Sequence, residues 1–162
     1  MRAFLLCSVI ASVLCALSCS ESSRPLAPGR IHVPDDVDEI ILLEDPFNTP
    51  FPRDAVTIKA ASIEGDLLTL EVAYVGGCKP HRFALYGSAG FMESLPVQAR
   101  VFLSHDANGD ACEAFIQEDI VFDLTPLKRE FRKAYSRSGR IGLRITEPGR
   151  DEPITPLPFY EF

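Results

Sequence analysis

The sequence predicts an all-β domain, an antiparallel β-sandwich or small barrel of about six to seven strands with one short helix. Three observations lead to this prediction. Apolar and polar residues alternate in several short segments, which is the period-two pattern of half-buried strands. Turn residues, among them Gly65 and Asn108-Gly109, separate these segments. Apolar residues recur at helical spacing in residues 125–135. Short strands joined by turns are typical of a sandwich or a barrel.

The first expected strand covers residues 37–43, within an acidic part of the chain that contains several prolines. Pro46, Pro50 and Pro52 follow this strand. They exclude regular structure there, because proline has no backbone N–H and its ring fixes the φ angle. The sequence therefore predicts an irregular connection to the next strand.

The next two strands, residues 56–61 and 67–74, are expected to form a hairpin. Glu64-Gly65-Asp66 supplies the turn between them. A three-residue loop places Ile58 opposite Val72 on one apolar face, whereas a two-residue loop places the two apolar sets on opposite faces. We therefore expect the three-residue loop.

Residues 81–86 predict a further strand, and residues 97–105 and 110–124 form the clearest hairpin pattern of the chain. Asn108-Gly109 lies between these last two strands. This dipeptide is typical of type I′ turns, in which both central residues have a positive φ angle. The sequence therefore predicts that the two strands pair directly through a two-residue loop.

The register of that hairpin gives two specific expectations. Phe102 lies opposite Phe115, on the face away from the main apolar set, where a loop or a second element could cover both rings. His105 lies opposite Cys112, and paired residues have Cβ atoms only about 5 Å apart. Both expectations depend on direct pairing of the two strands.

The expected helix follows, with Thr125 as its N-cap and Pro126 at its first position. It ends before Gly139. Residues 141–145 alternate again and predict a last strand. Residues 147–162 contain four prolines and predict an extended C-terminal tail, in which Phe159, Tyr160 and Phe162 could pack on the domain.

The first residues of the chain have the layout of an export signal. Arg2 supplies a basic start, and residues 3–17 form an uncharged, largely apolar run. This run is shorter than the roughly 20 residues that cross a bilayer, and small residues at its end suit a signal peptidase. The sequence predicts a signal peptide over residues 1–18, a flexible spacer over 19–33, a single β-rich domain over 34–146 and the tail.

Around the expected cleavage site, Ala16-Leu17-Ser18-Cys19 resembles the lipobox of bacterial lipoprotein precursors, in which the cysteine after the cut receives lipid. Cys19 matches that cysteine and Ser18 the small residue before it, whereas Ala16 stands where the family most often has leucine. The resemblance covers the leader alone. It implies a palmitate-bearing anchor at Cys19 and a place in the cell envelope. By analogy with enteric lipoproteins, Ser20 implies the outer membrane. The alternative is a secreted protein.

The leader also partitions the five cysteines of the chain. Cys7 and Cys15 leave with the signal peptide, and Cys19 is the lipidation candidate. Cys78 and Cys112 remain as an even pair in an exported domain, which is first interpreted as a disulfide.

A zinc site is the alternative for this pair. Cys78 and His81 lie three residues apart, and the hairpin register brings His105 beside Cys112. Two thiolates and two imidazoles suit tetrahedral zinc, although an oxidising compartment favours the disulfide. Two free thiols are a third possibility, and without a CxxC motif the sequence gives no support for thioredoxin-like chemistry.

Other ligand and catalytic patterns are absent or incomplete. Asp106, Asn108 and Asp110 form the start of a calcium loop, but Ala111 and Gln117 stand where an EF-hand needs Gly and Glu. The chain contains no G-x-S-x-G motif of a serine hydrolase.

The net charge of −7, with no stripe of Lys and Arg among aromatic residues, excludes nucleic acid as an expected partner. We therefore expect a non-enzymatic envelope lipoprotein without a cofactor, which acts as a binding or structural module. Its expected partners are the membrane, through the anchor, and an envelope protein or ligand. A zinc-binding envelope protein is the alternative.

Overall fold

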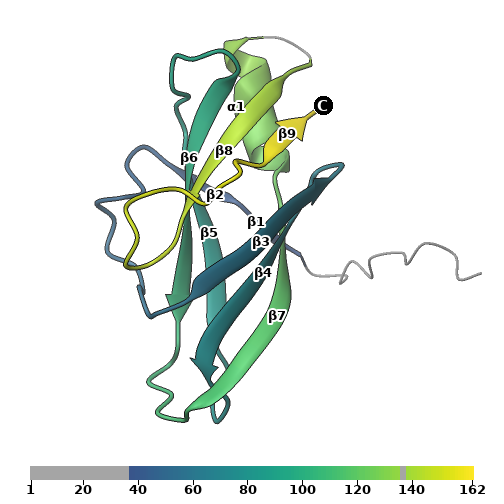
Figure 1. Cartoon of the computed structure of the whole chain (residues 1–162). Helices are drawn as coiled ribbons and strands as arrows, with labels where there is room; N and C mark the ends of the chain where they lie inside the picture. The colour runs from purple at the N-terminus through teal and green to yellow at the C-terminus, as the bar shows by residue number, and fades with distance from the viewer. Residues whose placement is uncertain (1–36, 136–137) are drawn as a thin grey trace, which may run out of the picture. The chain divides into compact units, whose positions relative to one another are not determined.

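In the computed structural model, which describes residues 37–135 and 138–162, the chain forms two facing β-sheets with one helix at one end (Figure 1). Among these residues there are nine strands, in the order β1-β7-β4-β3 in the first sheet and β2-β5-β6-β8-β9 in the second. The predicted all-β class with one helix is confirmed as a sandwich-like fold rather than a closed barrel. The sheets are mixed rather than purely antiparallel, because three of the strand pairs are parallel.

The strands and the helix have the following bounds. The first sheet contains β1 (Asp38–Glu39), β7 (Ala114–Asp123), β4 (Leu67–Gly76) and β3 (Thr57–Glu64). The second sheet contains β2 (Ile41–Leu43), β5 (Arg82–Ser88), β6 (Val97–Asp106), β8 (Arg140–Thr146) and β9 (Phe159–Glu161). The helix α1 spans Thr125–Ala134.

The first predicted strand contributes to both sheets. β1 pairs with β7 and β2 pairs with β5, and Ile40 between them is buried. The Ile40 N–H donates to the Asp123 carbonyl at 2.9 Å. One short segment therefore joins the edges of the two sheets.

The β3–β4 hairpin has a two-residue turn and not the expected three-residue loop. Glu64 pairs with Leu67, and Gly65 adopts a φ of +59° in the turn. Ile58 nevertheless lies opposite Val72, as predicted, because the register shifts at a β-bulge between Ile58 and Ala60. A bulge adds one residue to a strand and so returns the apolar side chains to the buried face.

The predicted pairing of residues 97–105 with 110–124 is wrong. The Asn108-Gly109 turn exists, with φ angles of 54° and 62°. However, β6 pairs with β5 and β8, whereas β7 pairs with β4 in the other sheet. Residues 101–105 of β6 are buried without alternation, which is the pattern of a strand covered on both faces. The turn therefore carries the chain from one sheet to the other, and Phe102 does not face Phe115.

A loop covers the outer face of the second sheet through aromatic contacts. Phe51 stacks on Tyr86 with ring centroids 4.4 Å apart and lies 5.0 Å from Phe102. The Arg53 guanidinium lies over the Phe51 and Phe102 rings. The expectation of a covering loop is thus confirmed for Phe102, whereas Phe115 is 67% exposed.

The helix begins one residue earlier than predicted. Thr125 is its first residue rather than its N-cap, and the Asp123 carboxylate accepts hydrogen bonds from the Thr125 N–H and hydroxyl at 2.8 and 2.6 Å. A carboxylate at this end is favourable because the helix dipole is positive there. Leu127 and Phe131 are buried, whereas Tyr135 is 51% exposed.

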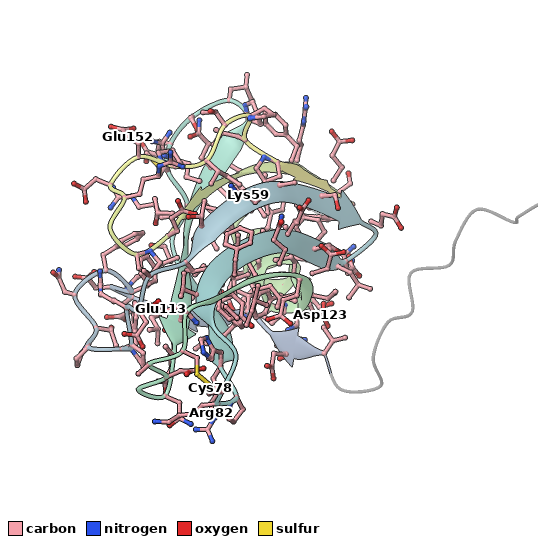
Figure 2. The ribbon with its side chains drawn as sticks, turned by 60° about the horizontal axis from the view of Figure 1, so that its bottom comes forward. Lys59, Cys78, Arg82, Glu113, Asp123 and Glu152 are labelled. Carbon is pink, nitrogen blue, oxygen red and sulfur yellow. A yellow bond between two sulfur atoms is a disulfide. The ribbon has the colours of Figure 1, made fainter. Side chains whose placement is uncertain are left out.

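Residues 147–162 return to the core of the domain. β9 pairs with β8, and Tyr160 is fully buried. Inward-facing residues of both sheets, the helix and this last segment form one apolar cluster; its fully buried members are Leu68, Leu70, Val72, Leu85, Ala99, Val101, Leu103, Leu124, Leu127, Ile141, Leu143, Ile145 and Tyr160. Figure 2 shows the domain from the disulfide end, with Cys78 near Arg82.

Candidate functional site: the disulfide end and the adjoining cleft

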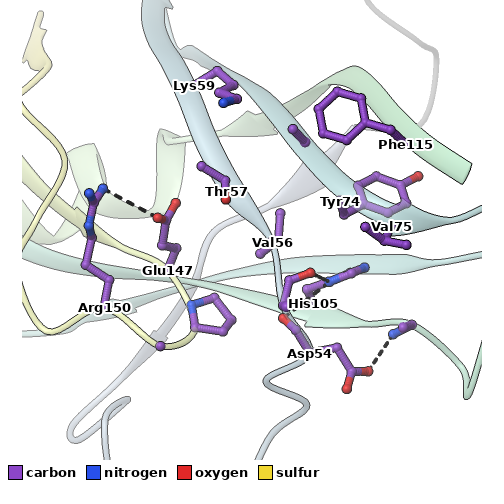
Figure 3. A pocket seen from close by; sticks show the side chains of 15 residues that line it. Asp54, Val56, Thr57, Lys59, Tyr74, Val75, His105, Phe115, Glu147 and Arg150 are labelled. Carbon is purple, nitrogen blue, oxygen red and sulfur yellow. Dashed lines mark hydrogen bonds and ion pairs between the residues drawn. The ribbon is translucent and has the colours of Figure 1, made fainter. Parts of the chain in front are cut away.

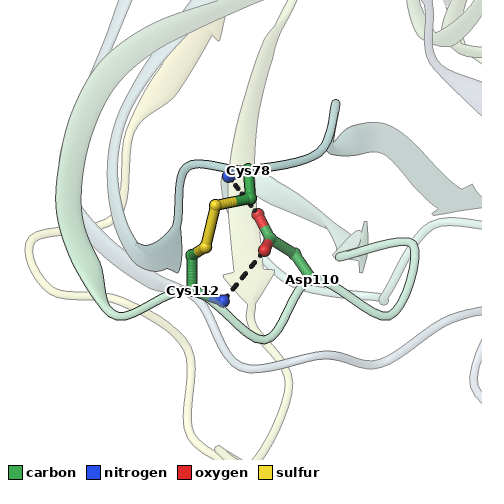
Figure 4. Close-up of side chains that lie close together, drawn as sticks. All are labelled: Cys78, Asp110 and Cys112. Carbon is green, nitrogen blue, oxygen red and sulfur yellow. Dashed lines mark hydrogen bonds between the residues drawn. A yellow bond between two sulfur atoms is a disulfide. The ribbon is translucent and has the colours of Figure 1, made fainter.

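A disulfide joins Cys78 to Cys112, as predicted, with Cα atoms 5.8 Å apart (Figure 4). Cys78 follows β4 in the first sheet, and Cys112 lies in the connection from β6 to β7. The bond therefore ties the loop that crosses between the sheets to the end of β4.

Beside the disulfide, Asp110 holds the same loop through backbone hydrogen bonds. Its Oδ2 accepts the N–H groups of Gly77, Cys78 and Lys79 at 2.8, 2.8 and 3.0 Å. Its Oδ1 accepts the N–H of Cys112 at 3.0 Å (Figure 4). The Cys112 N–H is the main cause that lowers the pKa of Asp110, and the Cys78 and Lys79 N–H groups add to it against the opposing effect of burial. Asp110 is thus held as a carboxylate.

The two predicted histidines lie side by side in this region. His81 Nδ1 is 2.8 Å from His105 Nε2, and His105 Nδ1 is 3.0 Å from the Ala55 carbonyl oxygen. A carbonyl only accepts, so His105 carries a proton on Nδ1, and its Nε2 makes the contact with His81. Burial lowers the pKa of His105, which favours this neutral form. His81 Nε2 lies 3.3 Å from Asp110 Oδ2.

This geometry favours the disulfide over the alternative zinc site, whose ligands would be Cys78, His81, His105 and Cys112. Cys78 and Cys112 are bonded to each other, and both ring nitrogens of His105 are hydrogen-bonded within the chain. Among the described residues, the metal-ligand atoms that converge belong to Cys78, Asp110 and Cys112, without either histidine. His105 also lies opposite Phe83 on β5 rather than opposite Cys112, so the predicted register that brought it there is wrong.

Tyr74 adds a polar contact to this region that sequence reasoning missed. Its hydroxyl donates to Glu118 Oε1 at 2.6 Å, and its ring lies 4.6 Å from the His81 ring and 5.1 Å from the His105 ring. Burial, together with the Glu118 carboxylate, raises the pKa of Tyr74 to about 12. The pairing of β4 with β7 brings Tyr74 and Glu118 together, and no local pattern predicts it.

A cleft of about 670 Å³ opens next to His105 (Figure 3). The segment that enters β3, the end of β4, the start of β7 and the loop after β8 line it. Its lining combines apolar with charged side chains; these include Val56, Tyr74, Val75, Phe115, Pro148, Asp54, Lys59, Glu147 and Arg150. Val75 pairs with Phe115 across the strands, and these side chains are 55% and 67% exposed.

Glu147 connects the two walls of this cleft. Its carboxylate accepts the Ile58 N–H of β3 through Oε2, and its Oε1 lies 3.4 Å from Arg150 Nη1. Glu147 is 6% exposed, whereas the Arg150 side chain is 53% exposed. The buried Glu147 carboxylate therefore holds the loop after β8 against β3. The exposed Arg150 side chain places a positive charge at the edge of the cleft (Figure 3). Sequence reasoning placed both residues in the tail and assigned them no role.

Cys19 and the rest of the leader lie outside the described residues, so the lipidation site stays a prediction from the sequence. In the described part of the chain, no helix is long and apolar enough to cross a membrane.

Neither known protein families nor curated proteins match this chain. Among solved structures, it resembles a NigD-like immunity protein from Bacteroides caccae, with 18% identity and a TM-score of 0.53 over 68% of this chain and 52% of that one. This chain thus spans about half the length of that protein. At this identity the similarity concerns the fold alone.

Two further solved structures are more distant. One is a protein of unknown function from Bacteroides vulgatus, with 18% identity, a TM-score of 0.45, and coverage of 78% of this chain and 56% of that one. The other is a predicted lipoprotein from Bacteroides fragilis, with 10% identity, a TM-score of 0.48, and coverage of 76% and 69%. At these scores neither bears on the function.

Proposed function

We propose that this chain is an exported lipoprotein of a bacterial cell envelope, and that its β-sandwich domain binds a ligand or partner at the membrane surface. The disulfide between Cys78 and Cys112 carries the proposal. Such bonds persist in oxidising compartments and are rare in the cytosol. The export leader accounts for the three other cysteines of the chain, so each one has a role that agrees with export.

The lipid anchor is tested at Cys19. The wild-type protein is expected in the membrane fraction, with a mass that includes a diacylglyceryl group and fatty acid on the new N-terminus. The variant Cys19→Ala is expected to lack this mass and to leave the membrane fraction. A variant that stays in that fraction without lipid would contradict the anchor.

The cleft supports binding over a purely structural role. Phe115 and Val75 expose a cross-strand apolar pair at its rim, and exposed apolar surface beside charged groups is typical of interaction sites. Lys59 and Arg150 provide cations along the same cleft. The cleft therefore offers both apolar contact and charge to a partner.

Site-specific photo-crosslinking in intact cells tests this role. A benzophenone side chain in place of Phe115 is expected to give a discrete crosslinked species. The same group in place of Ser62, an exposed residue of β3 outside the cleft lining, is the control and is expected to give none. Equal patterns from the two positions would contradict binding at the cleft.

A zinc-binding envelope protein that uses Cys78, His81, His105 and Cys112 is the alternative, because His81 contacts Asp110, which in turn accepts the backbone N–H groups of both cysteines. Mass spectrometry of the exported protein distinguishes the two. The disulfide predicts a gain of about 2 Da on reduction, from two added hydrogens, and no bound metal. Two alkylatable thiols and stoichiometric zinc in unreduced protein would support the alternative.

A further inference from the structure

The charges of this chain are unevenly distributed. Seven of its 16 Lys and Arg residues lie between positions 128 and 144, where Glu130 is the single acidic residue. Residues 101–127 contain six acidic residues and neither Lys nor Arg. In a chain of net charge −7, this is a strong local excess of positive charge.

The fold separates these two charged regions. Helix α1 and the start of β8 lie at one end of the domain, and the loop between β6 and β7 lies at the other (Figure 1). Basic side chains at the first end are open to solvent, since Arg129, Lys133 and Arg140 are 57%, 71% and 52% exposed, and each forms a surface ion pair, with Glu39, Glu130 and Glu161 respectively. Surface ion pairs contribute little free energy, so these cations can exchange their glutamate for another anion. The end with the disulfide carries Asp106, Asp110 and Glu113, together with the cations Lys79 and Arg82.

Apolar side chains are exposed at the same end as the basic ones. The loop before β6 packs on the helix, because the Phe91 ring lies 5.8 Å from the Phe131 ring and 5.7 Å from the Tyr135 ring. Leu95 in this loop is 100% exposed, and Tyr135 is 51% exposed. We call this surface the helix end; it consists of Met92, Leu95, Arg129, Lys133, Tyr135 and Arg140.

We propose that the helix end rests on a layer of anionic phospholipids, with Leu95 among the acyl chains and the basic side chains at the phosphates. Exposed apolar and aromatic residues beside Lys and Arg are the combination that membrane interfaces bind. Anionic headgroups attract the exposed cations of the helix end. The inference rests on the proposed lipid anchor, which keeps the domain within reach of a bilayer. This contact of the helix end with the bilayer orients the disulfide end away from it.

Vesicle binding tests this inference without the anchor. The unlipidated chain of residues 20–162 contains every described strand and the whole apolar core. It is expected to bind vesicles with about 30% phosphatidylglycerol and not vesicles of phosphatidylcholine alone, and to dissociate as salt rises from about 0.1 to 0.5 M. Equal binding to both vesicles, or to neither, would overturn the inference. Lipidation of Cys19 is measured separately, so the proposed function can stand if this binding fails.

A matched pair of double variants locates the contact. Arg129→Gln with Lys133→Gln removes two charges at the helix end, and glutamine keeps the helix propensity. The loss of two cations is expected to weaken vesicle binding by roughly tenfold or more. Lys79→Gln with Arg82→Gln removes two charges near the disulfide and is expected to change binding less than about twofold. Equal losses in both pairs would mean non-specific attraction to a polyanion and would overturn the inference.

Tryptophan reporters test the orientation, because the chain contains no Trp. In the single-Trp variant Leu95→Trp, anionic vesicles are expected to shift the emission to the blue, and brominated lipids are expected to quench it. Phe115→Trp, near the opposite end, is expected to show neither effect. A response at position 115 instead of position 95 would overturn the orientation. So would a Leu95→Trp that responds to a protein partner but not to vesicles.

Discussion

His81 Nδ1 lies 2.8 Å from His105 Nε2, in a chain of buried polar contacts that runs from Asp110 to the Ala55 carbonyl. His105 belongs to β6, and Ala55, His81 and Asp110 come from three different connections between strands. Among the described residues, each buried side-chain nitrogen and oxygen has a hydrogen-bond partner. A polar network, rather than strand pairing, therefore joins the disulfide loop to the start of β3.

The tautomers of this pair can be measured. His105 faces carbonyl oxygens through Nδ1, so we expect a neutral ring with its proton on that nitrogen. Burial lowers the pKa of His105, so the ring should stay neutral at pH values below the ordinary pKa of histidine. Nitrogen-15 NMR of the ring at neutral pH reports the protonated nitrogen. A neutral ring with its proton on Nε2 would contradict the hydrogen bond from His105 Nδ1 to the Ala55 carbonyl.

Acid is expected to destabilise the domain through two carboxylates. Hydrogen bonds from Lys128 and then Tyr160 lower the pKa of Asp66, and backbone N–H groups lower that of Asp110. A carboxyl with a lowered pKa in the folded state contributes stability above its unfolded pKa, and that contribution is lost as the pH falls through its folded pKa. The urea midpoint should therefore decrease from about pH 5 downwards.

Two variants check the source of this acid sensitivity. Asp66→Asn and Asp110→Asn should each flatten the decrease below about pH 5, because an amide does not titrate. Glu64→Gln is the control, since Glu64 is an exposed residue at the end of β3. A decrease that is the same in all three variants would rule out Asp66 and Asp110 as its cause.

Removal of the disulfide should cost several kcal/mol. The bond closes a loop with a sequence separation of 34, for which the chain-entropy account gives about 4 kcal/mol. The free energy of unfolding of Cys78→Ser with Cys112→Ser, measured in urea, should be lower by about this amount. A difference below about 1 kcal/mol would mean that the unfolded chain is constrained in another way.

A matched pair of glycines tests the packing beneath the helix. A Cβ at Gly139 would lie 2.2 Å from the Phe131 ring, whereas a Cβ at Gly90 has no atom within 4 Å. Gly139→Ala is expected to cost about 1–3 kcal/mol, as overpacking does. Gly90→Ala should change the free energy of unfolding by less than about 0.5 kcal/mol. Equal effects in thermal unfolding would show that Phe131 moves aside freely.

The last strand should be essential for stability. Tyr160 is fully buried and its hydroxyl donates to Asp66 at 2.6 Å, whereas the neighbouring Phe159 is 40% exposed. Tyr160→Ala should cost about 3–5 kcal/mol, as the removal of a buried aromatic ring does. Phe159→Ala is the comparison and should cost less than about 1 kcal/mol. A folded domain of unchanged stability after Tyr160→Ala would contradict the role of β9 in the core.

Short-range sequence patterns predicted the positions of the strands better than they predicted which strands pair. Alternation located the strands around residues 58, 72 and 85, because a strand with one buried face has a local period of two. Alternation also located β6, but its predicted partner was wrong, because β6 lies inside its sheet between β5 and β8. Asn108-Gly109 specifies a chain reversal, but a reversal does not determine whether the second strand joins the same sheet.

Part of the candidate site was predictable and part was not. Cys78 and Cys112 could be paired because the predicted leader left two cysteines in a domain that is expected to be exported. The roles of Asp110, Tyr74 and Glu147 could not be predicted, since their partners lie on other strands or loops. Asp110 appeared in the sequence as part of an incomplete calcium loop, whereas in the structure it accepts four backbone hydrogen bonds.

The sequence by itself determined the all-β class, the single helix and the pairing of Cys78 with Cys112, which follow from period and spacing along the chain. Export and lipidation at Cys19 stay predictions, from the layout of the leader and from its resemblance to a lipobox. Only the tertiary structure decided that β6 and β7 belong to different sheets, that the last strand pairs with β8, and that Glu147 is buried. The physical reason is that burial of β6 on both faces and pairing of β7 with β4 are long-range contacts, which no local pattern encodes.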